Sequence, residues 1–321
     1  MRFREPANKT LYRLASLVKR ILLLHRSFCL HFVQAEDPAS GMHLVYIGEG
    51  ESLNYLRKTY FGQSKEAEIT TIPLWHLKRK IGQLVSREAL IFVEINRMLT
   101  PLIPGGGWLT FPWIRQRVSL KSNDYEERRH KIEGTFGRKV RKFNYRFQIS
   151  REKEPVVRFY HELYLPYITT RFGDEAHLRA LSELQAVLRS GFLLQVFSED
   201  LWVSGAMCRV KKGDLSVIAF GHLPEPQYEL QRGALGAAYY FIFKWAEENL
   251  TFEVDLLRSR PNAEDGVYEH KRRWGARSEI DSWPHTALWI FRLKGSEIPQ
   301  SIKSLLIWTG NGFVEIGHLN P

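Results

Sequence analysis

The sequence predicts an α/β protein built on sheets of mixed direction. Strand-like apolar segments follow one another at 192–198, 201–210 and 214–221, and a Lys-Lys-Gly-Asp turn typical of a hairpin separates the last two. A helical pattern at 233–249 and a further strand at 252–258 come next. Because a helix–strand unit follows the meander, we expect a mixed, mostly antiparallel sheet flanked by helices.

The first half of the chain shows a similar alternation. Strands are predicted at 28–33, 44–47 and 89–95, and short helices at 51–61 and 75–85. We therefore expect the first half to form an α/β domain as well.

A basic helix is predicted between residues 125 and 145. Ile132, Phe136, Val140 and Phe143 recur at helical spacing, and arginines and lysines occupy the other faces. This helix is a natural end for the first half.

A chain of 321 residues is long enough for two domains. We place their boundary after the basic helix, which gives domains 1–150 and 151–321. The second domain is completed by helices predicted at 155–165, 175–190 and 267–274 and by a strand at 286–293.

Composition and charge narrow the range of partners. The 46 Lys and Arg against 35 Asp and Glu give a formal charge of +11, which favours a nucleotide cofactor, a nucleic acid or an anionic membrane surface. Cys29 and Cys208 have no C-x-x-C spacing, so a reducing cytoplasm is expected. The longest apolar stretch, 233–243, is shorter than the ~20 residues of a membrane span. We expect a cytoplasmic protein that is at most peripheral to a membrane.

The N-terminal segment predicts an amphipathic helix. Its apolar positions recur at helical spacing, and Arg13, Lys19 and Arg20 occupy the other face. Such a helix could lie on a membrane or pack its apolar stripe on the first domain's sheet, and the second alternative is preferred. The apolar positions are Leu11, Leu14, Leu17, Val18, Ile21 and Leu22.

The segment from Gln231 to Gly236 opens the predicted helix at 233–249 with small residues. Small side chains let a ligand approach backbone N–H groups that have no partner within the helix, and the helix dipole favours an anion there. A pyrophosphate would suit this position. The alternative, weighed equally, is that the small residues allow close helix–sheet packing. The candidate cofactor-binding residues are Gln231, Arg232, Gly233, Ala234 and Gly236.

A second group of polar residues follows the strand at 252–258. Asp255 could accept a proton from an amine, and Lys271 could stabilise an oxyanion or bind a phosphate. Asp255 could equally form an ion pair with Arg258, Arg260 or Lys271. The 11 histidines contain no HExxH pair, so no metal site is expected, although His222 and His270 flank the proposed cleft.

Several motifs between residues 110 and 280 carry a resemblance to one superfamily. The last of them contains a Tyr-x-x-Lys-x-x-Trp-Gly pattern. On these motifs the chain resembles the GNAT superfamily, specifically its FemAB-like branch of acyl and aminoacyl transferases. The motifs are Trp113-Ile114-Arg115, Arg138-Lys139-Val140-Arg141-Lys142, Phe159-Tyr160, Tyr164, Pro166, Arg171-Phe172-Gly173, Gly205-Ala206, Gly233-Ala234, the run from Asp255 to Pro261 and the run from Asp265 to Ala276.

The resemblance implies two tandem GNAT-like domains. The first, 1–150, would be degenerate, and the second, 151–321, would carry the acyltransferase site. Lys271 matches the family's lysine near the acyl donor. Gln231, Ala234 and Gly236 approximate the superfamily's Gln/Arg-x-x-Gly-x-Gly/Ala loop, with alanine where the first glycine is expected.

The leading hypothesis is an N-acyltransferase that moves an acyl group from acyl-CoA, acetyl-CoA or longer, to an amine. The acceptor would be a small molecule or a cell-envelope precursor. The catalytic candidates are Asp255, Lys271 and Tyr268, and the substrate-binding candidates are Arg258, Arg260 and His222. The alternatives are an aminoacyl-tRNA-dependent transferase acting on a cell-wall precursor, with tRNA as partner, and a non-catalytic module that binds an anionic ligand.

Overall fold

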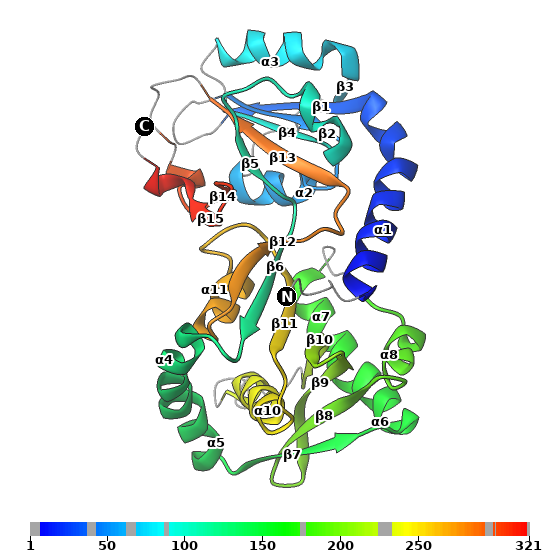
Figure 1. Ribbon diagram of the computed structural model, residues 1–321, viewed down its shortest axis with the longest axis vertical. Helices are drawn as coiled ribbons and strands as arrows, with labels where there is room; N and C mark the ends of the chain where they lie inside the picture. Colours follow the sequence, from blue (N-terminus) through cyan, green and yellow to red (C-terminus); the bar gives the residue numbers. More distant parts are fainter. Residues whose placement is uncertain are drawn as a thin grey trace, which may run out of the picture. The chain divides into compact units, whose positions relative to one another are not determined.

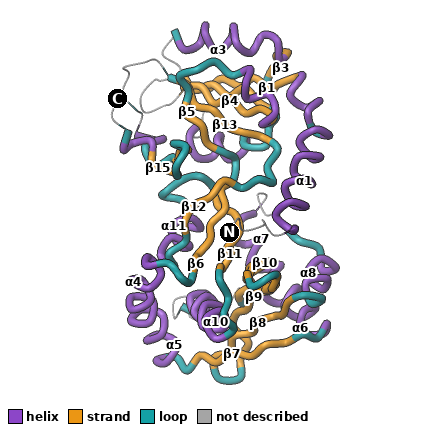
Figure 2. The backbone as a smooth tube through the Cα atoms, viewed as in Figure 1, coloured by secondary structure: helices purple, strands orange, loops and turns teal. Residues whose placement is uncertain are grey.

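The computed structural model describes residues 7–36, 43–61, 69–86, 90–173, 178–223, 233–292, 298 and 300–319. The chain forms two compact units (Figure 1). The first contains residues 1–114, 258–269 and 278–321, and the second contains residues 115–257 and 270–277. Two mixed, mostly antiparallel sheets flanked by helices confirm the predicted fold class (Figure 2).

The two units divide the chain differently from the expected boundary at residue 150. The chain leaves the first unit after residue 114 and later returns to it. The return includes β13 (Thr286–Phe291), which pairs antiparallel with β4 (Leu90–Asn96) on one side and with β5 (Trp108–Thr110) on the other. A strand's own sequence pattern does not reveal which sheet it joins, so the sequence placed this strand in the second domain.

The first unit is built on an eight-stranded sheet with the order β15-β14-β5-β13-β4-β2-β1-β3. Leu44 and Tyr46 belong to one apolar cluster and Val45 and Ile47 to another, because successive residues of a strand point to opposite faces. Both faces of this sheet are therefore covered. Its other elements are α1 (Ala7–Leu22), β1 (Cys29–Glu36), β2 (His43–Gly48), α2 (Leu53–Leu56), β3 (Thr70–Pro73), α3 (Leu77–Val85), β14 (Leu306–Trp308) and β15 (Phe313–Glu315).

The second unit contains most of a seven-stranded sheet with the order β12-β6-β11-β10-β9-β8-β7. The predicted meander is confirmed as β8 (Gly191–Ser198), β9 (Leu201–Lys211) and β10 (Asp214–His222), which pair antiparallel in sequence order. Its helices are α4 (Asn123–Ile132), α5 (Arg138–Lys142), α6 (Lys153–Arg158), α7 (Leu165–Phe172), α8 (Leu181–Val187) and α10 (Ala234–Glu248). Four further elements are β6 (Ile114–Ser119), β7 (Tyr145–Ser150), β11 (Glu253–Ser259) and β12 (Arg277–Ile280).

Helices cover both faces of the second sheet. Phe192 and Leu194 of β8 lie in the apolar cluster that includes α10, whereas Leu193 lies in the cluster that includes α8. On the α10 face, Phe147 of β7 stacks on Phe241 with ring centroids 4.7 Å apart. This alternation fixes which residues of β7 and β8 face away from α10.

The predicted N-terminal helix forms as α1, but its apolar stripe is not packed on the first sheet as expected. All six of its large apolar positions are between 43% and 67% exposed. The side that packs on the first unit is polar: Ser16 is buried, the Tyr12 hydroxyl donates to Asp281 at 3.2 Å, and Arg20 donates to the Ser282 carbonyl at 2.9 Å. The preference for apolar packing was wrong, because the partners of the polar side, Asp281 and Ser282, lie far from α1 in the chain and could not be read from its own pattern.

Candidate functional site

The candidate site in the second unit begins where two parallel strands stop pairing. The ladder between β10 and β11 joins Asp214 to Glu253, Leu215 to Val254 and Ser216 to Asp255. Beyond these three pairs, the described residues of the two strands have no ladder in common, although β10 continues to His222. The pairing of β10 with β9 also shifts register between residues 217 and 219. The strands therefore diverge at their C-terminal ends.

The N-terminus of α10 follows the C-terminal end of β10 in the chain. Gly233 precedes the helix with φ 94°, a left-handed conformation that favours glycine. The Ala237 N–H donates to the Gly233 carbonyl at 2.9 Å, which is the first bond of the helix. The N–H groups of residues 234–236 therefore have no acceptor within the helix. Such groups can bind an anion.

A lysine lies beside this helix N-terminus. A Cβ atom added to Gly233 would stand 3.2 Å from Cδ and 3.6 Å from Nζ of Lys139, which is exposed on α5. A cation at the positive end of a helix dipole is unfavourable by itself and becomes favourable when an anion binds between them. Lys139 was part of the basic helix predicted from the sequence but was not assigned to the cofactor site.

One aromatic ring joins the start of α10 to the cationic segment after residue 270. A Cβ added to Gly236 would lie 2.7 Å from a ring carbon of Phe136. The same ring stacks on the buried Trp274, with centroids 4.3 Å apart. Trp274 also donates its backbone N–H to the Lys271 carbonyl at 3.0 Å. The structure therefore brings these two predicted parts of the site to the same side of the second unit.

A histidine and a tyrosine lie in contact next to this junction. The rings of Tyr239 on α10 and His270 on α11 (Gly266–Arg273) have centroids 4.6 Å apart in an edge-to-face arrangement. Tyr239 also stacks on Phe220 of β10 at 4.3 Å. Burial raises the pKa of the Tyr239 phenol, so this group stays protonated at neutral pH.

His270 is held in its neutral form. Burial, followed by the nearby cations Arg171, Arg273 and Lys271, lowers the pKa of its imidazole from 6.5 to about 4. Its Nε2 atom is buried and forms no hydrogen bond with the part of the chain that the structure describes. A neutral imidazole of this kind can accept a hydrogen bond from a ligand through its unprotonated nitrogen.

Helix α7 adds two further polar groups. Arg171 donates to the Tyr167 hydroxyl at 2.6 Å, and the Tyr167 ring lies 6.3 Å from that of His222 at the end of β10. His222 is 2% exposed. Because Arg171 also lowers the pKa of His270, α7, β10, α10 and α11 converge on one cluster of aromatic and basic side chains, which we call the histidine cluster.

Asp255 is engaged in an ion pair that the sequence did not suggest. Its carboxylate accepts two hydrogen bonds from Nε of Arg115, at 3.1 and 2.9 Å, and pairs with the Nη2 atom of the same residue. It also accepts the Leu257 N–H at 2.9 Å, and Arg117 lies 3.9 Å away. The side chain is 4% exposed. Through its ion pair with Arg115, Asp255 thus links β11 to β6.

Three other predicted site residues belong to the first unit. Arg258 pairs with Asp281. The guanidinium of Arg260 lies over the ring of Trp113 at 3.8 Å. The buried Tyr268 accepts a hydrogen bond from the Ser278 hydroxyl at 3.3 Å.

Of the remaining predicted residues, some lie in the part of the chain that the structure describes and some do not. Gln231 and Arg232 lie outside the described residues. Lys271 is 5% exposed in the second unit, where Ala234 is also buried. The sequence did not assign Tyr167, Arg171 or Tyr239 to the site, although Arg171 belongs to one of the family-like motifs, since no local pattern links α7 or the middle of α10 to α11.

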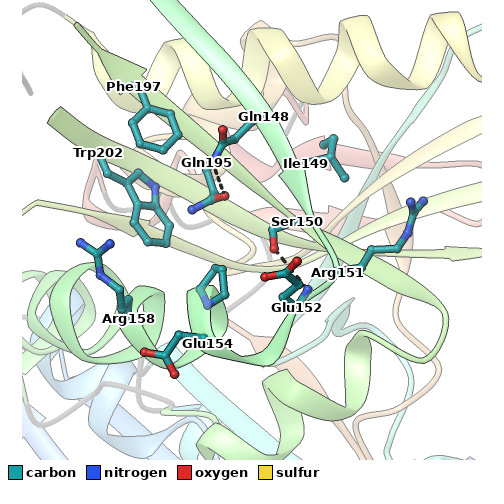
Figure 3. A pocket seen from close by; sticks show the side chains of 11 residues that line it. Gln148, Ile149, Ser150, Arg151, Glu152, Glu154, Arg158, Gln195, Phe197 and Trp202 are labelled. Carbon is teal, nitrogen blue, oxygen red and sulfur yellow. Dashed lines mark hydrogen bonds between the residues drawn. The ribbon is translucent and has the colours of Figure 1, made fainter. Parts of the chain in front are cut away.

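A separate polar pocket of about 700 Å³ lies on the opposite face of the second sheet (Figure 3). Phe147 faces α10, so the next residue, Gln148, points away from it. Gln148 donates to the Gln195 side chain at 2.9 Å, and Arg158 lies over the Trp202 ring at 5.6 Å. None of the predicted site residues lines this pocket. The described residues also contain no group of three or more His, Cys, Asp or Glu side chains that could hold a metal ion.

Comparisons with known proteins give structural similarity at low sequence identity. No protein-family model and no curated protein matches the chain. The chain is similar to the solved structure of FemX, with a TM-score of 0.41 and 13% identity over 82% of this chain and 84% of that chain. It is similar to the structure of L-PGS from Bacillus licheniformis, with a TM-score of 0.38 and 12% identity over 83% and 81% of the two chains. It is also similar to a GCN5-related N-acetyltransferase from Kribbella flavida, with a TM-score of 0.32 and 12% identity over 89% and 96%.

Proposed function

We propose that the chain is an N-acyltransferase that transfers an acyl group from an acyl-CoA thioester to an amine. The observation that carries this proposal is the start of α10, where backbone N–H groups with no acceptor in the helix lie beside Lys139 and next to two diverging strands. The N–H groups and Lys139 suit the phosphates of a donor. The divergence of β10 from β11 leaves backbone groups of β10 with which an extended acyl arm can pair.

The donor's pyrophosphate would bind the N–H groups of residues 234–236 and the ammonium of Lys139. Gln231 and Arg232 remain proposed as further contacts. Gly233 suits this role because its left-handed backbone starts the helix. The absence of a side chain at Gly236 has a structural explanation too, since Phe136 occupies the space that a Cβ would need.

The histidine cluster would bind the amine, and the leaving thiolate would take up its proton. An amine attacks the thioester carbonyl, a C–N bond forms, and the C–S bond breaks to release the CoA thiolate. The nitrogen loses a proton, which the CoA thiolate takes up, and neutral His270, whose Nε2 has no hydrogen-bond partner within the described chain, would accept a hydrogen bond from the amine. Lys271, or a backbone N–H of β10, would stabilise the oxyanion of the intermediate.

One of the predicted catalytic residues takes a different part in this proposal. Asp255 was predicted as the base, but its carboxylate is engaged by Arg115 and the Leu257 N–H, so we assign it the positioning of β11. Tyr268 stays a prediction, as do Arg258, Arg260 and His222 as substrate-binding residues.

Calorimetric titration with acetyl-CoA, with longer acyl-CoA thioesters and with free CoA tests the donor site. Lys139→Ala should weaken the binding of all of them about tenfold, because an ion pair to phosphate is lost. Lys131→Ala, at an exposed lysine of α4, serves as the control. If no thioester binds, or if Lys131→Ala weakens binding as much as Lys139→Ala, the proposed donor site is wrong.

A second candidate is an aminoacyl-tRNA-dependent transferase that acts on a cell-wall precursor. The observation in its favour is the exposed basic surface of α4 and α5, to which Arg128, Lys131, Arg138 and Lys142 contribute. Gel retardation of tRNA at low salt distinguishes the two donors. Salt-sensitive retardation together with no binding of acyl-CoA would favour the tRNA-dependent reaction.

A further inference from the structure

Helix α1 presents an apolar face to solvent. Its six large apolar residues lie on one side of the helix, and each is at least 43% exposed. Phe28, in the short turn that follows the helix, is also exposed. Exposed apolar residues scattered singly are ordinary, but a continuous face along a whole helix marks an interaction surface. We call this surface the α1 face: Leu11, Leu14, Leu17, Val18, Ile21, Leu22 and Phe28.

The first unit fixes this orientation through the polar side of the helix. Tyr12 stacks on Trp283 with centroids 5.7 Å apart, and the Lys19 ammonium lies 4.8 Å from the centre of the same ring. At the C-terminal end, Asn96 donates to the Arg20 carbonyl at 2.7 Å. Turning the helix to bury its apolar side would break these contacts. The α1 face is therefore held outward by the folded unit.

The charged residues on α1 itself are all cationic. Helix α1 carries Lys9, Arg13, Lys19 and Arg20 and no acidic residue. Arg13 borders the apolar face on the helix itself, and Arg26 is exposed just after it. An apolar face bordered by cations matches the interface of an anionic bilayer, where the face enters the headgroup region and the cations meet lipid phosphates.

We propose that the α1 face docks the chain on the surface of an anionic phospholipid membrane, with the helix lying in the plane of the interface. A second copy of the chain fits less well, because pairing two such faces would bring Arg13, Arg26 and their counterparts together. Within the described residues, no helix is long and apolar enough to cross a bilayer. The inference concerns α1 alone and does not depend on the proposed acyl transfer.

Vesicle flotation with the full chain tests the proposal. Vesicles of phosphatidylcholine alone are compared with vesicles that also contain phosphatidylserine, at low and high salt. The wild type should float with the anionic vesicles, and less so at high salt. Leu14→Gln with Ile21→Gln should reduce the bound fraction at least about tenfold, because each buried leucine or isoleucine contributes that much to partitioning.

Matched controls make each outcome decisive. Leu250→Gln removes a leucine that is 83% exposed in the second unit and should leave flotation unchanged. Glutamine is a good helix former, so circular dichroism of the double variant should match the wild type. The proposal is overturned if the wild type does not float, if the double variant floats equally well, or if the double substitution instead abolishes a dimer seen by light scattering.

Discussion

The depressed pKa of His270 makes the stability of the second unit depend on pH. In the unfolded chain the imidazole is protonated below its ordinary pKa of 6.5, whereas in the native state it resists protonation until about 4. Between these values the unfolded state binds more protons, so stability rises with pH across the window and is lost as the pH falls. Above 6.5 the contribution of His270 no longer changes.

The magnitude follows from the two pKa values. At about 1.4 kcal/mol for each pKa unit, the difference between 6.5 and about 4 costs the native state about 3 kcal/mol when the pH reaches the lower value. His270→Gln removes the titrating group. The free energy of unfolding of the wild type should therefore fall by about 3 kcal/mol more than that of the variant on acidification.

Urea unfolding followed by tryptophan fluorescence measures this difference, because Trp274 lies within 6.4 Å of the His270 ring and reports on the same region. Wild type and His270→Gln are compared at neutral pH and at the lower edge of the window. His130→Gln, at an exposed histidine of α4, is the control and should follow the wild type. Equal pH dependence in the wild type and His270→Gln would refute the reasoning. Saturating CoA should reduce the difference in pH dependence between the wild type and His270→Gln if the phosphates of CoA offset the cations around His270.

Substitutions at three positions probe the packing and the ion pair around the site. Gly236→Ala should lower the free energy of unfolding by about 1–3 kcal/mol, because the new methyl group meets the Phe136 ring at 2.7 Å. Gly134→Ala meets no atom within 4 Å and should raise it by up to about 1 kcal/mol, and urea unfolding of both variants checks the contrast. Asp255→Ala should cost about 3 kcal/mol by leaving the Arg115 guanidinium without its carboxylate. Asp255→Asn should retain activity in proportion to its folded fraction, and a fully folded variant with no turnover would instead favour the predicted role as base.

The sequence predicted those features that depend on neighbouring residues. The meander, α10 and the strand after it follow from apolar periodicity, and a glycine at the start of α10 follows from the turn that the chain must make there.

The remaining features depend on residues that are distant in the sequence. Asp255 was expected to pair with cations close to it in the chain, but its partner Arg115 precedes it by 140 residues on a neighbouring strand. The helical pattern of α1 was recognised, yet amphipathicity alone does not say which face is buried, and the anchors Trp283 and Asn96 could not be foreseen. The neutral state of His270 likewise arises from its burial and from cations on α7 and α11 together.

The late arrival of β13 has a consequence for folding during synthesis on the ribosome. Until residues 286–291 emerge, β4 lacks its antiparallel neighbour and β5 has no strand to join it to the rest of its sheet. The second unit, whose strands are nearly all contiguous in the chain, can meanwhile be completed. A nascent chain halted after residue 150 would thus present an open β4 edge, which is a template for aggregation. We therefore expect the nascent chain to need a chaperone that covers the β4 edge until residues 286–291 have been synthesised.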